Sequence, residues 1–290
     1  MKVLVTGGSG LLGSRMLKCF PSDWQVTGTY HQHPAPGLIQ CSLSSLRSLA
    51  RLLQEGGYDC VVHCAAIRSP DACEEDPRRA VDVNAHGTEL LARAASNARA
   101  KLVYASTDAV FAGDAPPYRE QDRPAPLSVY GRSKLAGEKH ALAVPGALVV
   151  RMPALYSADL GAPNNILAGL KESLEAGKPV PADEQLARYY TLAEDVAAAV
   201  AFLVAGAVRG IVHFSADERS TKLEFLRAAA EAIGLDAGLV QPAELPAGSA
   251  ARPVDSHLDT GLYRSLGGPP FEGYRQALAR LSAALRPGPL

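Results

Sequence analysis

The strongest constraint on the fold is a glycine-rich turn near the start of the chain. Residues 6–13 read TGGSGLLG and stand between an apolar, β-branched run at residues 2–6 and a helical pattern at residues 11–20. Four glycines within seven residues let the backbone turn sharply and approach a negatively charged group at the positive end of the helix. The spacing fits both G-x-G-x-x-G and G-x-x-G-x-x-G and predicts a dinucleotide site. A tight strand-to-helix turn without a ligand is the alternative.

The remainder of the first half repeats this alternation of short β-branched runs and helical patterns. Such alternation indicates βαβ units and a parallel sheet covered on both faces, so we expect a doubly wound α/β Rossmann fold. Strands are expected at residues 2–6, 25–29, 38–41, 60–64, 101–106 and 147–151. Helices are expected at residues 11–20, 46–54, 77–97 and 130–142.

The second half predicts a smaller C-terminal substrate domain that interleaves with the first. Capping-box spacings at residues 191–194 (TLAE) and 221–224 (TKLE) precede Ala/Leu-rich core helices, which Gly206 and Gly234 would end. A strand at residues 210–215 can return to the main sheet. The expected division is therefore 1–155 with 192–215 for the dinucleotide, and 156–191 with 216–290 for the substrate. Loops are expected at 114–126, 242–253 and 267–273, and a frayed tail at 286–290.

Composition excludes several classes of protein. With 29 Lys and Arg against 30 Asp and Glu, the chain lacks the basic excess that nucleic-acid binding requires. No apolar run approaches the roughly 18 residues of a membrane span, so the chain is expected in the cytoplasm. Five cysteines without a C-x-x-C pair suit a reducing compartment.

The end of the second expected strand bears on the choice of cofactor. An acidic residue there would bind the ribose hydroxyls of NAD, but this chain has Tyr30 and His31. No carboxylate is present to repel a 2′-phosphate, and we expect His31, His33 and Arg15 near it. The pattern favours NADP, with NAD as the alternative. Two histidines alone seldom bind a metal ion, so no metal is expected.

A tyrosine and a lysine form the second candidate site. Tyr130 and Lys134 are four residues apart and share one helical face. We expect the ammonium to favour the phenolate and to lower the pKa of Tyr130 towards the range of proton transfer to a carbonyl oxygen. Thr107 follows an expected strand, at the sheet edge where doubly wound folds bind ligands. A surface Tyr/Lys pair is the alternative.

At this point the sequence resembles the extended short-chain dehydrogenase/reductases. Within them it is similar to the dTDP-4-dehydrorhamnose reductase group and to the regulatory β subunit of methionine adenosyltransferase. The resemblance rests on segments that cover most of the chain, namely 6–13, 61–66 (VVHCAA), 106–113 (STDAVFAG), 124–138, 151–156 (RMPALY) and 252–253.

The resemblance implies roles for individual residues. The catalytic hydroxyl falls on Thr107, the proton-donating tyrosine on Tyr130 and its lysine on Lys134, which also contacts the cofactor together with Tyr130. Further residues are implied at the cofactor: Gly7, Gly10, Leu11, Leu12, Gly13, Tyr30, His31, Cys64, Ala65 and Ala66. At the substrate, Asp108 and Arg252 are candidates, with a strand-end cap and an ion-paired or solvated arginine as their alternatives.

Three departures separate the chain from the family pattern. Ser42 and Leu43 stand where an acidic residue near the adenine is usual. Ala109 and Ala154 replace two aromatic residues, so two ring contacts that would shape a sugar pocket are absent. The segment around Ala154 is closer to the regulatory subunit than to the reductases.

The resemblance implies an NAD(P)H-dependent reduction of the C4 carbonyl of a deoxysugar nucleotide. One alternative is a cofactor-binding regulatory subunit that contacts a partner enzyme. Another is an epimerase or dehydratase of nucleotide sugars with tightly held NAD. A homodimer is expected by analogy with this fold.

Overall fold

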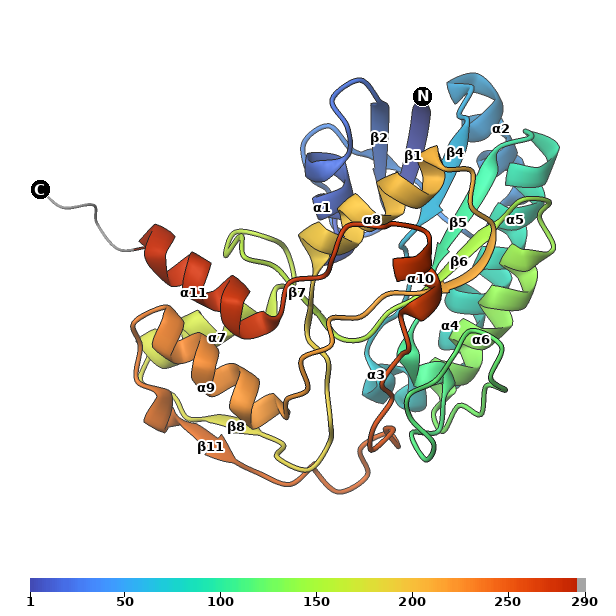
Figure 1. Cartoon of the computed structure of the whole chain (residues 1–290). Helices are drawn as coiled ribbons and strands as arrows, with labels where there is room; N and C mark the ends of the chain where they lie inside the picture. Colours follow the sequence, from blue (N-terminus) through green and yellow to red (C-terminus); the bar gives the residue numbers. More distant parts are fainter. Residues whose placement is uncertain (286–290) are drawn as a thin grey trace, which may run out of the picture.

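The computed structural model describes residues 1–285 and has a seven-stranded parallel sheet at its centre (Figure 1). The tail expected to fray, 286–290, lies outside the described residues. The sheet consists of β1 (Lys2–Thr6), β2 (Gln25–Tyr30), β3 (Ile39–Gln40), β4 (Cys60–His63), β5 (Lys101–Ala105), β6 (Leu148–Arg151) and β10 (Gly210–His213). The fold class predicted from sequence is confirmed.

The strand order has a reversal, a topological switch point, between β1 and β4. From edge to edge it is β10-β6-β5-β4-β1-β2-β3, so the chain proceeds outward from β1 to β3 and then restarts beside β1 at β4. Ligands bind at such a reversal, beyond the carboxyl ends of the strands. The glycine-rich turn follows β1, and residues 64–66 follow β4. Both expected cofactor segments therefore lie at this point.

Helices cover both faces of the sheet, as Figure 1 shows. On one face lie α1 (Leu11–Cys19) and α8 (Ala193–Ala205), and on the other α2 (Leu46–Gly56), α5 (Gly87–Asn97) and α6 (Val129–Leu142). Alternate residues of β1 serve the two faces, because Val3 and Val5 pack in the core with α1 and α8 while Leu4 packs with α2, α5 and α6. Helix α8 buries most of its residues, which confirms the core position expected for it.

One expected helix differs from the prediction. Residues 77–97 form α4 (Pro77–Val81), a π turn at Asp82–His86 and then α5, and a separate helix α3 (Pro70–Glu75) precedes them. Ser69 caps α3 by accepting a hydrogen bond from the Ala72 amide at 3.3 Å. The π turn inserts an extra residue and brings Asn84 inward, where it is buried.

The second half builds a smaller helical layer, at the lower left of Figure 1. It contains two short parallel pairs, β7 (Leu155–Tyr156) with β9 (Thr191–Leu192) and β8 (Val180–Ala182) with β11 (Val240–Pro242). Its helices are α7 (Ile166–Glu175), α9 (Lys222–Ala232) and α11 (Tyr274–Leu285), with a short 3₁₀ turn at Ala237–Leu239, whereas α10 (Gly261–Ser265) lies beside β10 of the main sheet. Another 3₁₀ turn, Asp108–Val110, follows β5. Strand β10 pairs with β6, which confirms the return to the main sheet. The division into two domains stays a prediction.

Of the two predicted capping boxes, one is confirmed and one is wrong. Thr221 accepts from the Glu224 amide, and the Glu224 carboxylate accepts from the Thr221 amide. Thr191 instead lies in β9, where its hydroxyl donates to the Tyr189 carbonyl and accepts from the Ala216 amide. Helix α8 begins only at Ala193, because tertiary partners occupy the hydroxyl that the local pattern assigned to a cap.

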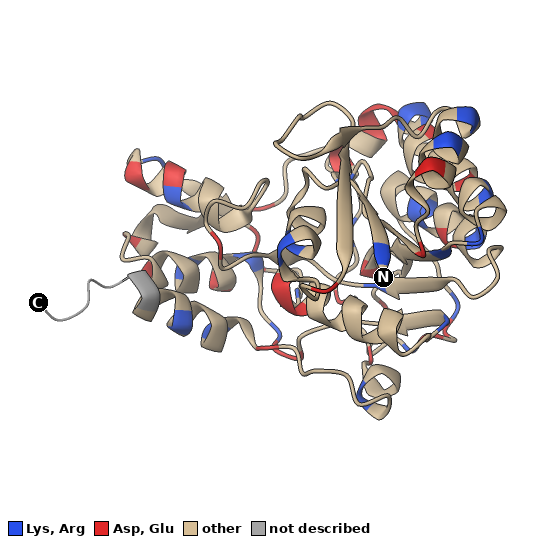
Figure 2. Cartoon of the chain, turned by 90° about the horizontal axis from the view of Figure 1, so that it is seen from above, with Lys and Arg blue, Asp and Glu red and all other residues tan. Residues whose placement is uncertain are grey.

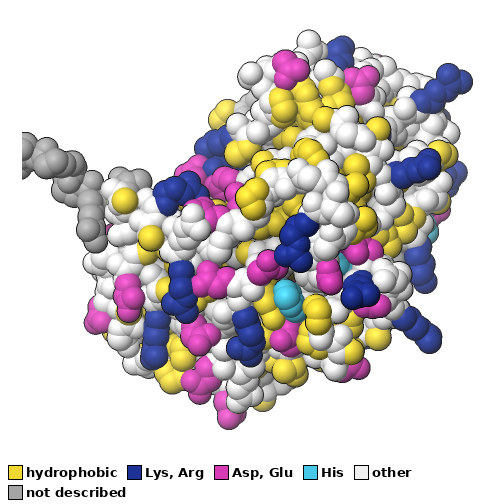
Figure 3. Space-filling model, in the orientation of Figure 1, with side chains coloured by type: hydrophobic (Ala, Val, Ile, Leu, Met, Phe, Trp, Pro, Cys, Tyr) yellow, Lys and Arg dark blue, Asp and Glu magenta, His cyan; other side chains and the backbone are white. Residues whose placement is uncertain are grey.

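Charged residues lie mainly on the peripheral helices and loops (Figure 2). On the face seen in Figure 3, Lys and Arg are interspersed with Asp and Glu and form no continuous basic stripe. Across residues 1–285, every helix is too short or too polar to cross a bilayer.

Candidate active site

The glycine-rich turn lies directly against the segment that follows β4. Gly7 has a positive φ of 72°, and a Cβ there would come within 2.8 Å of the Ala65 backbone nitrogen. A Cβ on Gly13 would overlap the Gly7 carbonyl, so close backbone approach requires both glycines. The structure therefore brings together two sets of predicted cofactor residues, the turn and the segment Cys64, Ala65 and Ala66.

The first backbone amides of helix α1 point out of its N-terminal end. Its N-cap is Gly10, which has no side chain to cap the helix, and its first turn reads LLGS. The amides of Leu11 and Leu12 are among those without a partner inside the helix, and the helix dipole favours negative charge there. This cradle fits the pyrophosphate of a dinucleotide.

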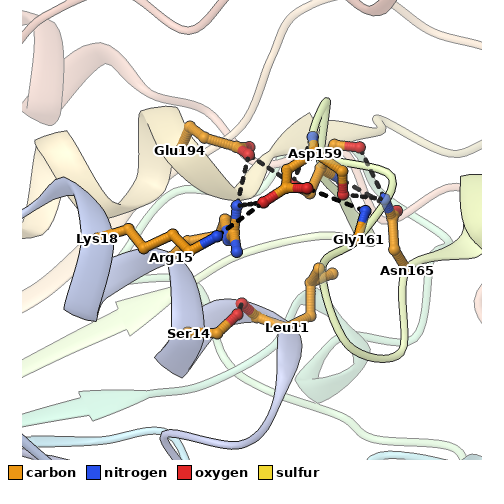
Figure 4. A network of polar contacts seen from close by, with 9 residues as sticks. Leu11, Ser14, Arg15, Lys18, Asp159, Gly161, Asn165 and Glu194 are labelled. Carbon is orange, nitrogen blue, oxygen red and sulfur yellow. Dashed lines mark hydrogen bonds and ion pairs between the residues drawn. The ribbon is translucent and has the colours of Figure 1, made fainter.

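The residues expected near a 2′-phosphate do not all gather at the end of β2. Tyr30 ends β2, and His31 and His33 follow it in an exposed bend. Arg15 was expected beside them, and that prediction is wrong. Its buried guanidinium donates to Asp159, in the segment after β7, at 2.6 Å (Figure 4).

A buried chain of hydrogen bonds, which sequence reasoning missed, leads away from the turn. Thr6 Oγ1 lies 2.7 Å from His63 Nδ1, His63 Nε2 lies 3.1 Å from Thr88 Oγ1, and the Thr88 hydroxyl donates to the Asn84 carbonyl at 2.7 Å. These contacts are all made when His63 Nε2 carries the proton and Nδ1 accepts from Thr6. Burial lowers the pKa of His63 to about 3, so the ring is neutral at pH 7. A histidine within an otherwise apolar strand was the available signal.

Asn84 links this chain to the helix that carries the predicted catalytic tyrosine. Its side-chain oxygen accepts from the Ile67 amide at 2.8 Å, and its nitrogen donates to the Ile67 carbonyl and to Ser133 Oγ, both at 3.0 Å. Ser133 in turn donates to the Tyr130 carbonyl at 2.8 Å. The π turn thus fixes the first turn of α6.

The three predicted catalytic residues lie together at the carboxyl end of β5. Tyr130 is in the first turn of α6, and Thr107 stands two residues beyond the end of β5 with its hydroxyl facing the phenol. Lys134 is buried one turn further along α6, and its Nζ donates to the Ala105 carbonyl at 2.7 Å. Their roles stay predictions, but their proximity is a feature of the fold.

The expected lowering of the tyrosine pKa is wrong for the protein without ligand. Burial raises the pKa of Tyr130 to about 12, and contact with Thr107 only partly opposes this effect. The Lys134 ammonium is held against β5 by Ala105, so burial of the phenol dominates. Tyr130 is therefore a neutral phenol at pH 7 and can donate a proton.

Asp108 lies next to the reacting groups and has partners from the second half of the chain. Its carboxylate accepts from the Thr107 hydroxyl at 3.1 Å and from the Ser256 hydroxyl at 2.5 Å. Burial raises the pKa of Asp108, and Ser256 and the nearby Arg188 oppose the rise. Ser256 and Arg188 are functional candidates that local sequence patterns did not reveal, because they meet Asp108 only in the folded chain.

Arg252, the second substrate candidate, is held in an ion pair. Its Nη2 donates to Asp71 at 2.6 Å, and the same carboxylate accepts from the Ala250 amide at 2.9 Å. These contacts lower the pKa of Asp71, with the Ala250 amide as the largest cause. The ion-paired alternative thus describes Arg252, and its contact with a substrate stays a prediction.

Comparison with known proteins agrees with this architecture. A family model described as the RmlD substrate binding domain matches residues 1–286. The chain belongs to this family.

Several relatives of the RmlD-family chain have names that indicate different activities. It is 36% identical over 276 residues to methionine adenosyltransferase 2 subunit beta of Danio rerio, covering 92% of this chain and 85% of that protein. It is 33% identical over 272 residues to a probable low-salt glycan biosynthesis reductase, Agl14, of Haloferax volcanii, covering 89% and 90%.

Two solved structures share the fold over most of their length. A hypothetical dTDP-4-dehydrorhamnose reductase from Sulfolobus tokodaii has a TM-score of 0.81 at 28% identity, covering 91% of this chain and 94% of that one. A Thermus thermophilus UDP-glucose 4-epimerase in complex with NAD has a TM-score of 0.83 at 25% identity, covering 98% and 99%.

Behind the site of this RmlD-family chain lies a buried ion pair. Arg151 donates to Glu138 from Nε at 2.9 Å and from Nη2 at 2.8 Å, and both side chains are 2% exposed. Glu138 also accepts from Ser106, the residue before Thr107. The pair thus braces β6 against α6, and the bond from Ser106 adds the end of β5 to this contact. Among residues 1–285, no three His, Cys, Asp or Glu side chains gather as metal ligands.

Proposed function

We propose that this chain is an NAD(P)H-dependent reductase of the C4 carbonyl of a deoxysugar nucleotide. The observation that carries the proposal is the convergence of Thr107, Tyr130 and Lys134 at the sheet edge that also bears the glycine-rich turn. A hydroxyl, a proton-donating phenol and a buried ammonium are the groups that carbonyl reduction requires.

The cofactor is held by backbone and small residues. The turn at Gly7, Gly10 and Gly13 and the amides of Leu11 and Leu12 accommodate the pyrophosphate, and Ala65 leaves room beside it. When bound, the reduced nicotinamide supplies the hydride. Lys134 hydrogen-bonds its ribose.

Two side chains of the protein would donate hydrogen bonds to the carbonyl oxygen of the substrate. Tyr130, neutral at pH 7, donates its proton to the oxygen as negative charge develops there, and Thr107 donates a hydrogen bond to the same atom. The Thr107 hydroxyl has one hydrogen, so it leaves its acceptor Asp108 when it donates to the carbonyl oxygen. The Asp108 carboxylate oxygen that Thr107 leaves can then accept from a sugar hydroxyl.

A nucleotide sugar is an anion, and basic groups line its expected path. Arg188 donates to the Pro253 carbonyl at 3.2 Å, next to Arg252, and Lys222 is near enough to Arg252 for its pKa to be lowered, although burial is the larger cause. Asp71 balances one of these charges. Arg188 and Lys222, which also have Asp108 and Asp183 nearby, are the groups that would pair with the diphosphate of the substrate.

NADP is the favoured cofactor. The carboxylate that would repel a 2′-phosphate is absent from the end of β2, and His31 and His33 are exposed there. Because Arg15 is turned away, the preference over NAD is expected to be modest.

The test follows oxidation of NADPH or NADH with dTDP-4-dehydro-6-deoxy-L-mannose for the wild type and Tyr130→Phe. The proposal predicts turnover that falls by about 10²–10⁴-fold in Tyr130→Phe, because that variant lacks the acidic hydroxyl. Cofactor affinity should change little. Turnover that is equal in the two proteins would contradict the assigned role of Tyr130.

A cofactor-binding regulatory subunit is the second candidate, favoured by the 36% identity to a methionine adenosyltransferase subunit. It predicts cofactor binding without sugar turnover and an effect on a methionine adenosyltransferase catalytic subunit in co-purification and activity assays. A protein that purifies with bound NAD and interconverts nucleotide sugars would instead support the epimerase or dehydratase alternative.

A further inference from the structure

Tyr104 lies on β5 directly beneath the helix that carries Tyr130 and Lys134. It is completely buried, and its hydroxyl donates to the Lys134 carbonyl at 3.3 Å. Helix α6 admits this hydroxyl because residue 137 is glycine, where a Cβ would overlap the phenol oxygen. Tyr104 therefore contacts the helix backbone at the level of Lys134.

The ring of Tyr104 also faces the lysine charge. Lys134 Nζ lies 4.1 Å from the ring centroid, well within the range of a cation–π interaction, while it donates to Ala105 O at 2.7 Å. Two adjacent residues of β5 thus contact one ammonium. An ammonium has two further hydrogens, which the proposed function assigns to the cofactor ribose.

The other titratable groups near the Lys134 ammonium are either neutral at pH 7 or already paired. Burial lowers the pKa of His63 and raises that of Cys64 to about 12, so both face Lys134 in their neutral forms at pH 7. Glu138, one turn along α6, favours the charged lysine, but its carboxylate is already paired with Arg151. Aromatic support from β5 is therefore an important part of what keeps this buried ammonium charged.

We propose that Tyr104 is the positioning residue for Lys134, with its ring supporting the ammonium and its hydroxyl supporting the helix backbone of the same residue. This inference rests on the proposed function only in so far as Lys134 contacts the cofactor. In this inference Tyr104 acts on the cofactor only through Lys134, by supporting the charge and the position of that side chain.

The consequence appears at alkaline pH. Burial lowers the pKa of Lys134 to about 8, so cofactor affinity should decline as the pH rises through about 8 and the ammonium loses its proton. Removing the ring removes support for the charged form only. The decline should then begin about one pH unit lower.

The experiment measures NADPH binding by fluorescence between about pH 6 and pH 9.5, a range that brackets this pKa. Tyr104→Leu should shift the decline downward, whereas Tyr104→Phe, which keeps the ring, should retain the wild-type midpoint. Lys134→Met should abolish the decline, which identifies the lysine as its source. Tyr104→Met, whose longer and more flexible side chain can adapt to the space, serves as the second ring deletion if Tyr104→Leu does not fold.

Three results would overturn the inference: an unchanged midpoint in the folded ring-deletion variant, an equal shift in Tyr104→Phe, or a decline that persists in Lys134→Met. Because binding is measured without a sugar, the outcome is separate from that of the proposed function. A shift with Tyr104→Leu in a protein that turns over no sugar would refute the reductase and leave this inference standing.

Discussion

At the residue scale, the glycines of this chain differ sharply in what they permit. A Cβ on Gly13 would overlap the Gly7 carbonyl, whereas a Cβ on Gly169 in α7 would meet nothing within 4 Å. The difference separates a glycine required by close approach from one that only costs conformational entropy.

We therefore expect opposite effects from the same substitution at these two positions. Gly13→Ala should lower the free energy of unfolding by about 1–3 kcal/mol and weaken NADPH binding at least tenfold, because the turn must open. Gly169→Ala, the matched control, should raise stability by up to about 1 kcal/mol. Urea denaturation and fluorescence titration measure both. Unchanged NADPH affinity in Gly13→Ala would contradict the placement of the cofactor at this turn.

The residue-level errors of the sequence predictions have a common physical origin. The partner of Arg15 is Asp159, 144 residues away, and no local pattern indicates such a contact. The four-residue spacing of Tyr130 and Lys134 correctly predicted that both lie on one helix. The direction in which the pKa of Tyr130 shifts depends instead on burial, which the tertiary structure decides. Composition and spacing identify these groups without fixing their environments.

At the element scale, periodicity predicted the strands and most helices, and failed where tertiary contacts override local pattern. The π turn is one such place, since its stabilising contacts are those of Asn84 with Ile67 and Ser133, on other segments. Thr191 is another, because its hydroxyl bonds within the sheet region instead of capping α8. Both exceptions lie at or near the junctions that position the site.

The buried Glu138–Arg151 pair joins β6 to α6 and gives an element-scale prediction. Glu138→Gln should lower the free energy of unfolding by about 3–5 kcal/mol, because it leaves the Arg151 charge buried without its counterion. The double variant Glu138→Leu/Arg151→Met should recover much of this loss.

An exposed pair supplies the control. Glu55→Gln breaks the Arg51–Glu55 contact on α2, where both side chains are largely in solvent, and should change stability by less than about 0.5 kcal/mol. If Glu138→Gln were as mild as Glu55→Gln, the pair would not be the brace described above. Urea midpoints of the four proteins decide this.

At the scale of the whole molecule, one ionic network joins the glycine-turn helix to the second half of the chain. Arg15 and Lys18 of α1 reach Asp159 at 2.6 and 3.0 Å, and Arg15 also lies 3.7 Å from Glu194 at the start of α8 (Figure 4). Ser157, two residues before Asp159, donates to Glu194 and accepts from the Asp159 amide, so the segment after β7 is tied to both helices.

This network predicts an acid-sensitive contribution to stability. Hydrogen bonds from Lys18 and Arg15 lower the pKa of Asp159 to about 2 from its ordinary value of 3.8. A depressed pKa stabilises the fold above the ordinary value, and this stabilisation is lost as the pH falls through about 2. The difference in urea midpoint between wild type and Asp159→Asn should therefore be largest near neutral pH and shrink between about pH 5 and pH 2.

Glu175→Gln, which breaks the exposed Lys171–Glu175 pair, should show little such dependence. If the difference in urea midpoint between wild type and Asp159→Asn stayed constant with pH, the charge of Asp159 would not contribute to stability.

The most direct test of the central claim is transfer of deuterium to the sugar from NADPH that carries deuterium at both C4 positions of the nicotinamide. With dTDP-4-dehydro-6-deoxy-L-mannose, mass spectrometry should find one deuterium at C4 of the product for the wild type, with transfer in Tyr130→Phe slowed by about 10²–10⁴-fold. A protein that binds NADPH tightly and yet transfers no deuterium would contradict the account and favour the regulatory subunit.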